Sequence, residues 1–247
     1  MMGPAKQNEI YLSVVAPAHN EAENLGRLVE EVTAVASGLK QPWEVVIVND
    51  GSTDETESVL RAQVKACPQL RVLSMKQRSG QTAAVEAGLR VARGRFVAMM
   101  DADLQNDPAD LPAMLELLAR DECDMVNGWR RDRQDPWIRL VSTRIANAVR
   151  NKLTHETIRD SACGLKVFKR ECLPPLKFFN GMHRFLPTLV RMEGFRVVEI
   201  PVHHRPRSAG KAKYGVLNRV FKALRDAFAV RWMQSRTVRY EFTEWER

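Results

Sequence analysis

Short apolar runs alternate with longer amphipathic segments along most of this chain. Six runs bounded by turn-forming residues predict strands, at residues 11–16, 44–48, 71–75, 96–100, 124–128 and 196–202. Residues 159–168 predict a turn leading into a further strand. Between the runs, apolar residues recur at helical spacing, most clearly at Leu25, Leu28, Val29, Val32 and Val35.

This alternation predicts right-handed βαβ units, and therefore an α/β fold with a mostly parallel central sheet flanked by helices. Further helices are expected at residues 54–65, 137–153, 182–192 and 216–234. Asn20 is expected to cap the first helix, and Ser52 or Thr53 the second.

The run Phe96–Met100 ends abruptly at a carboxylate, and a second carboxylate follows two residues later. In extended chain, side chains alternate, so Asp101 and Asp103 are expected to point the same way. They repel each other unless a cation lies between them, and hard oxygen ligands suit Mg²⁺ or Mn²⁺. Gln105 is a candidate third ligand. The alternative interpretation is that these carboxylates only start a turn.

Ligands of parallel α/β sheets bind outside the carboxyl ends of the strands. Three of the predicted strands end in polar clusters, at His19–Glu21, Asn49–Gly51 and Asp101–Asp103. We expect these clusters to converge on one crevice.

The net charge of +8 hides an asymmetry. Residues 1–128 carry 12 Lys and Arg against 19 Asp and Glu, whereas residues 129–247 carry 26 against 11. The two parts therefore have net charges of −7 and +15, which favours a partner that brings anionic groups. Nucleic acid, an anionic lipid surface and a phosphorylated substrate all satisfy this condition.

No apolar run approaches the roughly 20 residues that span a bilayer, and the N-terminus lacks the apolar core of a signal peptide. We therefore expect a cytosolic protein whose four cysteines are free thiols. His203 and His204 are expected to finish a strand rather than to bind metal. The chain also lacks the Gly-x4-Gly-Lys-Ser/Thr sequence of P-loop enzymes.

The second part of the chain is strongly basic. Residues 205–215 form a basic loop with two glycines, interpreted either as a solvated surface loop or as a clamp over phosphates. In the helix expected at 216–234, Phe221, Leu224 and Phe228 alternate with basic residues. Such a helix either docks on the core or anchors at a membrane surface. Residues 1–10 and 235–247 are expected to be a disordered N-terminus and a flexible tail.

Four ordered motifs resemble those of family 2 glycosyltransferases with the GT-A fold: Val15–Glu21, Val48–Asp54, Met100–Gln105 and Arg207–Gly215. The resemblance is stronger to the polyprenyl-phosphate branch, which includes dolichyl-phosphate mannose synthases and bacterial undecaprenyl-phosphate glycosyltransferases. Arg133–Asp135 and Ile200–His204 look most like the bacterial enzymes. The likeness implies a catalytic domain over residues 11–215.

The resemblance also implies roles for individual residues. It places a nucleotide-binding set at Pro17, Asn20, Glu21, Asp50, Gly51, Asp101 and Ala102, with Asp50 at the base. It assigns the divalent metal, Mg²⁺ or Mn²⁺, to Asp101, Asp103 and Gln105. It assigns the acceptor phosphate to Arg130 together with Arg139 or Arg144, and to the loop residues Arg207, Lys211 and Lys213. Asp160 falls where the family has an acidic residue near the reaction centre, so Asp103, Asp160 and Arg130 form the expected catalytic set.

The sequence departs from the family pattern at three motif positions. His19 stands where Tyr is common, Asn49 where Asp is frequent, and Ala212 where Ser is usual. The transmembrane helices that follow the catalytic domain in many bacterial relatives are also absent. We therefore expect a peripheral protein at the cytoplasmic face of the membrane, or one that docks on a separate membrane subunit.

The implied reaction is attack of a polyprenyl-phosphate oxygen on the anomeric carbon of a UDP- or GDP-sugar, with inversion. A phosphate monoester has its second pKa near ~6 and needs no general base at neutral pH. One alternative is transfer to a hydroxyl of a polysaccharide or glycolipid, with Asp160 as base. A more distant one is a non-enzymatic nucleic-acid-binding protein. It is disfavoured because the chain has no recognisable motif for DNA or RNA, and no nucleic-acid partner is expected.

Overall fold

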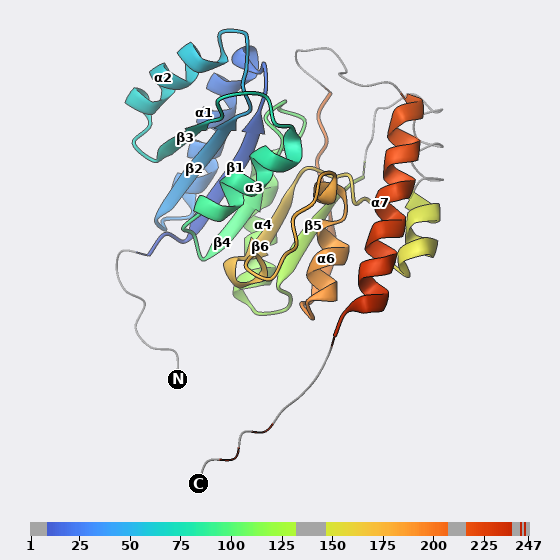
Figure 1. Cartoon of the computed structure of the whole chain (residues 1–247). Helices are drawn as coiled ribbons and strands as arrows, with labels where there is room; N and C mark the ends of the chain where they lie inside the picture. Colours follow the sequence, from blue (N-terminus) through green and yellow to red (C-terminus); the bar gives the residue numbers. More distant parts are fainter. Residues whose placement is uncertain (1–8, 132–146, 207–215, 239–242, 244, 246–247) are drawn as a thin grey trace.

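The protein is built around one seven-stranded sheet, seen in a computed structural model that describes residues 9–131, 147–206, 216–238, 243 and 245 (Figure 1). The strands are β1 (Leu12–Ala18), β2 (Trp43–Asn49), β3 (Leu70–Ser74), β4 (Phe96–Met99), β5 (Met125–Arg130), β6 (Lys166–Lys169) and β7 (Val197–Val202). Their order is β3-β2-β1-β4-β6-β5-β7. The expected α/β fold with a mostly parallel sheet is confirmed.

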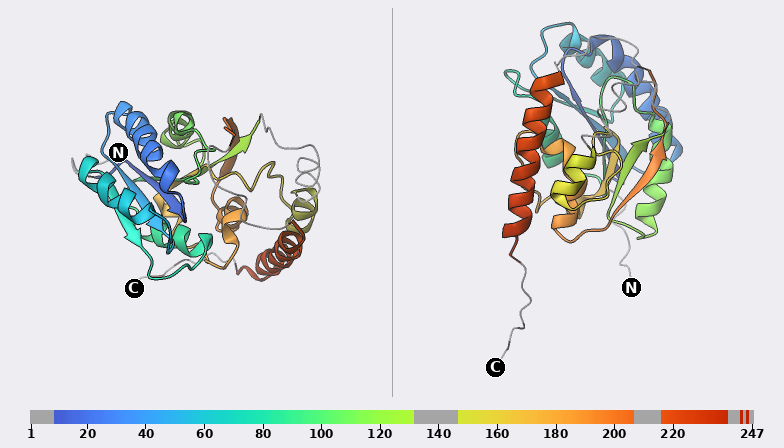
Figure 2. Two further views of the ribbon diagram at one scale, coloured as in Figure 1. Left: turned by 90° about the horizontal axis from the view of Figure 1, so that it is seen from above. Right: turned by 90° about the vertical axis from the view of Figure 1, so that its right-hand side faces the viewer.

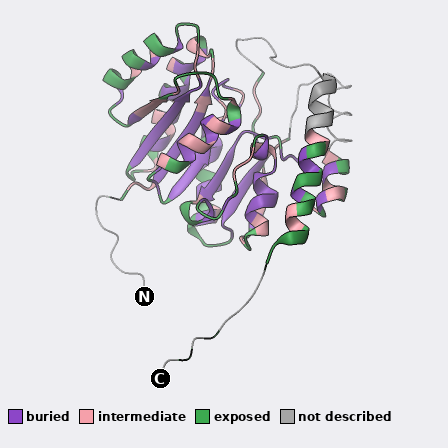
Figure 3. Cartoon of the chain, in the orientation of Figure 1, coloured by how far each residue is buried: buried purple, intermediate pink, exposed green. Residues whose placement is uncertain are grey.

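Helices cover both faces of this sheet (Figure 2). They are α1 (Ala22–Gly38), α2 (Thr56–Ala66), α3 (Gln81–Val91), α4 (Leu111–Ala119), α6 (Leu186–Met192) and α7 (Val216–Arg236), with short 3-10 turns η1 (Pro108–Asp110), η2 (Arg170–Cys172) and η3 (Met182–Arg184). Alternation along β1 divides the core: Val14 faces the layer of α1 and α4, whereas Val15 faces the layer of α3, α6 and α7. The strands are accordingly the most buried part of the chain (Figure 3).

Strand β6 runs against its neighbours. It pairs antiparallel with β4 on one side and with β5 on the other, so that Lys166 lies opposite both Met99 and Asn127. The remaining pairs, β3 with β2, β2 with β1, β1 with β4, and β5 with β7, are parallel. As a result, the carboxyl ends of β4 and β5 and the amino end of β6 share one edge of the sheet.

Helix α7 docks on the core and also presents an apolar outer face. Ala227 and Val230 are buried, whereas the side chains of Phe228 and Trp232 are 59% and 63% exposed. Gln234 Nε2 donates a hydrogen bond of 2.8 Å to the carbonyl oxygen of Thr154, which ties α7 to the helical residues 147–154. Among the described residues, no helix is both long and apolar enough to cross a bilayer.

Several local expectations were wrong. Asn20 does not cap α1, which begins after Glu21 without a side-chain cap. The φ of Asn20, 55°, lies in the left-handed region. Neither Ser52 nor Thr53 caps α2, which starts only at Thr56. The helix expected at 182–192 is split into η3 and α6, and α6 has Pro187 in its first turn. Most of the helix expected at 137–153 lies outside the described residues, which begin again at residue 147.

Candidate active site

The loops after β1 and β2 are joined side by side at the carboxyl edge of the sheet. His19 Nδ1 lies 2.8 Å from the carbonyl oxygen of Asp50, and the Thr53 amide donates to Asn20 Oδ1 at 2.8 Å. The amide of Glu21 donates to Thr56 Oγ1 at 3.0 Å. The side chain expected to cap a helix therefore holds the neighbouring loop, and the clusters after β1 and β2 do lie together.

Asp50 connects this pair of loops to the segment after β3. Its buried carboxylate accepts hydrogen bonds from the amides of Ser79, at 2.6 Å, and Gly80, at 2.9 Å. Next to it, Gly51 has a φ of 57°, and a Cβ there would lie 2.4 Å from the Arg78 amide nitrogen. Only glycine fits such a position without strain, so the backbone at this corner requires glycine at residue 51.

The carboxylate motif after β4 forms a turn rather than extended chain. The strand ends at Met99, residues 102–104 form the turn, and Leu104 has a φ of 60°. The expectation that Asp101 and Asp103 point the same way assumed extended chain, and this assumption was wrong. Asp101 Oδ1 accepts a hydrogen bond of 3.1 Å from Gln81 Nε2, and Asp103 Oδ1 accepts one of 3.2 Å from the Gln105 amide.

Gln105 meets the segment that follows β7. Its carbonyl oxygen accepts from the Arg205 amide at 2.9 Å, and its side-chain Nε2 lies 3.5 Å from His204 Nε2. Arg205 itself pairs with Glu31 at 2.6 Å and with Asp107 at 2.8 Å. His203 pairs with Asp110 at 2.7 Å. The start of the basic loop is thus fixed beside the carboxylate motif.

A second charged group lies at the ends of β5 and β6. Arg130 donates from Nε to Asp160 Oδ2 at 2.6 Å and from Nη2 to Oδ1 at 2.9 Å. Both side chains are largely buried, and a two-point arginine–carboxylate pair is strong and directional. Asn127 Nδ2 holds the backbone behind this pair by donating to the carbonyl oxygen of Asp160 at 3.2 Å.

The donor groups of the carboxylate motif fit a hard divalent cation. Mg²⁺ and Mn²⁺ need oxygen ligands, often only one or two carboxylates with substrate phosphates completing the shell. Asp101 and Asp103 offer such oxygens, and Gln105 offers an amide oxygen. The described residues contain no cluster of three or more His, Cys, Asp or Glu that would form a complete protein cage. Gly164 leaves room for the Asp101 carboxylate, because a Cβ there would lie 2.2 Å from Oδ2.

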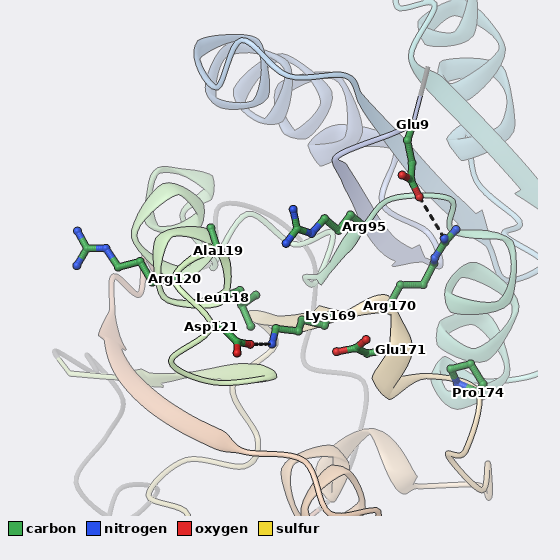
Figure 4. Close-up of a pocket in the computed structure, with 10 residues that line it drawn as sticks. All are labelled: Glu9, Arg95, Leu118, Ala119, Arg120, Asp121, Lys169, Arg170, Glu171 and Pro174. Atoms are coloured by element: carbon green, nitrogen blue, oxygen red, sulfur yellow. Dashed lines mark hydrogen bonds and ion pairs between the residues drawn. The ribbon is translucent and has the colours of Figure 1, made fainter. Parts of the chain in front are cut away.

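A separate cavity of about 800 Å³ lies at the opposite, amino edge of the parallel strands (Figure 4). Two ion pairs lie within its lining: Lys169 pairs with Asp121, and Arg170 pairs with Glu9 at 3.6 Å. None of the candidate site residues lines it. This cavity is therefore not part of the candidate site.

The structure brings most of the predicted site residues to one edge of the sheet. Pro17 lies at the end of β1, and Ala102 is buried in the core with an exposed fraction of 3%. The expected phosphate-binding residues Arg139, Arg144, Arg207, Lys211 and Lys213 lie outside the described residues.

Sequence reasoning missed three residues that contact the predicted ones. Gln81 binds Asp101, Gly164 packs against the same carboxylate, and Arg205 joins the basic loop to α1 and η1. Arg205 could have been identified from the sequence, because it is the first residue of the basic loop. The other two contacts join segments distant in the sequence, and no local pattern reveals them.

The fold and this edge define a class of protein. Residues 13–174 match the family model described as glycosyl transferase family 2, so the chain belongs to that family. The resemblance seen in the sequence motifs, including the polyprenyl-phosphate branch, is confirmed.

Two curated relatives are similar over most of this chain. A dodecaprenyl-phosphate galacturonate synthase of Rhizobium johnstonii is 38% identical over 223 residues, which cover 89% of this chain and 66% of the relative. An undecaprenyl-phosphate 4-deoxy-4-formamido-L-arabinose transferase of Edwardsiella ictaluri is 32% identical, covering 84% of this chain and 64% of the relative. The chain thus spans slightly less than two thirds of the length of these two relatives.

Solved structures share the fold. Glucosyl-3-phosphoglycerate synthase from Mycobacterium tuberculosis, in complex with Mn²⁺, UDP and glucosyl-3-phosphoglycerate, has a TM-score of 0.69 and 20% identity, covering 91% of this chain and 80% of that one. A mannosyltransferase from Pyrobaculum calidifontis, in complex with GDP-Man and Mn²⁺, has a TM-score of 0.59 and 21% identity, covering 92% and 74%. These likenesses agree with the expected GT-A fold.

Proposed function

We propose that this protein is an inverting glycosyltransferase that moves a sugar from a UDP- or GDP-sugar to a polyprenyl phosphate. The observation that carries the proposal is the adjacency of two charged groups at one sheet edge: the carboxylate motif Asp101–Gln105 and the Arg130–Asp160 pair. The names of the curated relatives, which act on dodecaprenyl or undecaprenyl phosphate, support the same acceptor.

On the donor side, the loops after β1 and β2 would hold the nucleotide, through Pro17, Asn20, Glu21 and Asp50. Asp101, Asp103 and Gln105 would hold Mg²⁺ or Mn²⁺ against the diphosphate. Bound there, the cation would neutralise charge on the departing nucleoside diphosphate. The Mn²⁺ complexes of the two solved structures, which share this fold, support such a metal.

On the acceptor side, Arg130 at the end of β5 would bind the phosphate, held in place by Asp160. A guanidinium binds phosphate oxygens in pairs, and the basic residues Arg139, Arg144, Arg207, Lys211 and Lys213 would add to its field. Attack by a phosphate dianion needs charge compensation but no general base.

The alternative with a hydroxyl acceptor is less well supported. It needs Asp160 to accept a proton, yet both carboxylate oxygens of Asp160 already accept hydrogen bonds from Arg130. This geometry suits a residue that orients Arg130 better than one that acts as a base.

The lipid acceptor implies work at a membrane. We propose that the protein binds peripherally at the cytoplasmic face, or docks on a membrane-embedded subunit, through the outer face of α7. Phe228 and Trp232 give that face its apolar character, and Arg225 and Arg231 are exposed on the same helix. Aromatic and basic side chains together favour an anionic lipid surface.

The deciding experiment is a transfer assay with labelled UDP- and GDP-sugars, undecaprenyl phosphate and Mg²⁺ or Mn²⁺. Label extracted into the organic phase reports the lipid product. We expect metal-dependent labelling, and a loss of at least about 100-fold in Asp103→Asn because a metal ligand carrying charge is removed. The thermal midpoint should stay close to that of the wild type.

Glu116→Gln is the matched control, since Glu116 is an exposed carboxylate on α4 away from the candidate site. Near-normal turnover in Asp103→Asn would refute the metal assignment. Label that enters an oligosaccharide, but never the lipid, would refute the polyprenyl-phosphate acceptor and favour the hydroxyl alternative.

A further inference from the structure

We propose that the turn Asp160–Leu165, anchored by the buried ammonium of Lys166, is a shared wall that positions the metal-binding carboxylate and the acceptor arginine relative to each other. The inference rests on the proposed function for the names of these two subsites. It adds two positioning residues, Gly164 and Lys166, that do not themselves contact the substrates.

The two ends of the turn touch the two subsites. At its beginning, Asp160 makes the two-point ion pair with Arg130. Near its end, Gly164 packs so closely on the carboxylate motif that a Cβ would lie 2.2 Å from Asp101 Oδ2 and 2.6 Å from Asn106 Oδ1. Only three residues, 161–163, therefore separate the contact to one subsite from the contact to the other.

Lys166 anchors this turn to the sheet. It is 1% exposed and lies in β6 between Met99 of β4 and Asn127 of β5. Its Nζ donates a hydrogen bond to the carbonyl oxygen of Cys163, inside the turn. The flanking strands are the two that lead into the carboxylate motif and into Arg130, so the anchor is attached to both.

A buried lysine charge is costly unless nearby groups compensate for it. Burial lowers the pKa of Lys166, whereas Cys163, Asp160 and Asp101 act in the opposite direction. The ammonium thus lies within the electrostatic reach of a carboxylate from each subsite. It offsets part of the repulsion among acidic groups gathered at this edge.

The outer side of the turn is held by a second buried cation. Arg150, in the helical residues 147–154, donates from Nη2 to the carbonyl oxygen of Ile158 at 3.0 Å and from Nη1 to Ser161 Oγ. The Gly128 amide donates to the carbonyl oxygen of Leu165 at 3.0 Å. Held on three sides, the turn cannot shift at one subsite without moving at the other.

The first test is Gly164→Ala, compared with Gly38→Ala, where a Cβ would meet nothing within 4 Å. Mn²⁺ binding is measured by electron paramagnetic resonance, with the metal alone and with UDP or GDP added. In Gly164→Ala the new methyl group displaces the Asp101 carboxylate, so we expect the Kd for Mn²⁺ to rise at least fivefold. Gly38→Ala should bind as the wild type does. An unchanged Kd in Gly164→Ala would overturn the proposal.

The second test is Lys166→Met, which keeps the size of the side chain but removes its charge and its hydrogen bond. We expect the KM for undecaprenyl phosphate to rise at least fivefold, because the turn that holds Asp160 is released. The Kd for Mn²⁺ should also differ from that of the wild type, because the released turn includes Gly164, which packs on Asp101. A merely space-filling lysine predicts wild-type values for both quantities, and that result would refute its role as an anchor.

The two proposals can fail separately. If the wild type never labels undecaprenyl phosphate but Gly164→Ala still weakens Mn²⁺ binding, the acceptor is wrong and the positioning of Asp101 stands. If the wild type transfers sugar and Gly164→Ala binds Mn²⁺ normally, the positioning proposal is wrong and the function stands.

Discussion

His183 shows how strongly the protein interior can change the pKa of a single side chain. Its ring keeps some contact with solvent, but most of it is enclosed, and Nδ1 lies 3.0 Å from Thr82 Oγ1. Burial, followed by the positive charges of Arg184 and Lys166, lowers its pKa to about 3. The imidazole is therefore neutral in the folded protein at physiological pH, and it serves as a hydrogen-bond partner for Thr82.

This neutral state has a consequence for stability. The pKa of His183 in the unfolded chain is near ~6.5, so below that pH the unfolded state binds a proton that the folded state refuses. The contribution is fully present above about pH 6.5 and declines towards pH 3, by up to about 1.4 kcal/mol per pH unit. Urea unfolding at pH 7 and pH 5 should show the wild type losing about 2 kcal/mol more than His183→Gln. Equal losses in both proteins would contradict the lowered pKa. Paired carboxylates such as Asp124 titrate below this window.

At the scale of elements, periodicity was enough to predict where the strands lie along the chain. Each parallel strand is a local apolar run, and runs do not depend on distant residues. The predicted caps failed because Asn20 and Ser52 bond across to each other's loops: Asn20 Oδ1 accepts from the Thr53 amide at 2.8 Å, and Ser52 Oγ accepts from the Asn20 amide at 2.9 Å. The placement of β6 between β4 and β5 was also beyond sequence reasoning, since a four-residue strand carries no signal for its neighbours or direction.

The two interpretations of the last helix are not exclusive at this scale. Ala227 and Val230 dock α7 on the core, while Phe228 and Trp232 face outward and Leu224 is half-buried. The side chain of Phe221 lies outside the described residues.

We expect the double variant Phe228→Ser and Trp232→Ser to bind anionic vesicles at least tenfold more weakly in a sedimentation assay. The loss follows from removing apolar area that would enter the lipid interface. Because both side chains are mostly exposed, the thermal midpoint should change little. Val64→Ser, at an exposed valine of α2, is the matched control. Unchanged binding of the double variant would exclude the outer face of α7 as the anchor.

For the whole molecule, the separation of charge along the sequence agrees with the two proposed subsites, one for a metal and one for phosphate. Residues 1–128, with a net charge of −7, carry the carboxylate motif, and residues 129–247, with +15, carry Arg130 and the basic loop. An acidic part suits a metal and a basic part suits phosphates or anionic lipid.

Vesicle binding should therefore depend on salt. Raising salt from about 50 mM to about 300 mM shortens the Debye length and should weaken binding to anionic vesicles at least tenfold. Binding to neutral vesicles should be weak at both concentrations. Duplex DNA is the control polyanion: if it binds more tightly than the vesicles do at about 150 mM salt, the nucleic-acid alternative returns. Salt-independent binding to anionic vesicles would instead leave the basic part without an electrostatic role.

The antiparallel strand β6 also determines where the sheet can separate during partial unfolding. The parallel block β3-β2-β1-β4 is built from residues 12–99, a continuous piece of chain. The block β5-β7 meets it in the described sheet only across the four residues of β6. Cooperative opening units often coincide with such blocks. Amide hydrogen exchange along β6 then reports the separation of the proposed donor-binding and acceptor-binding parts, and its rate should slow when ligands occupy both.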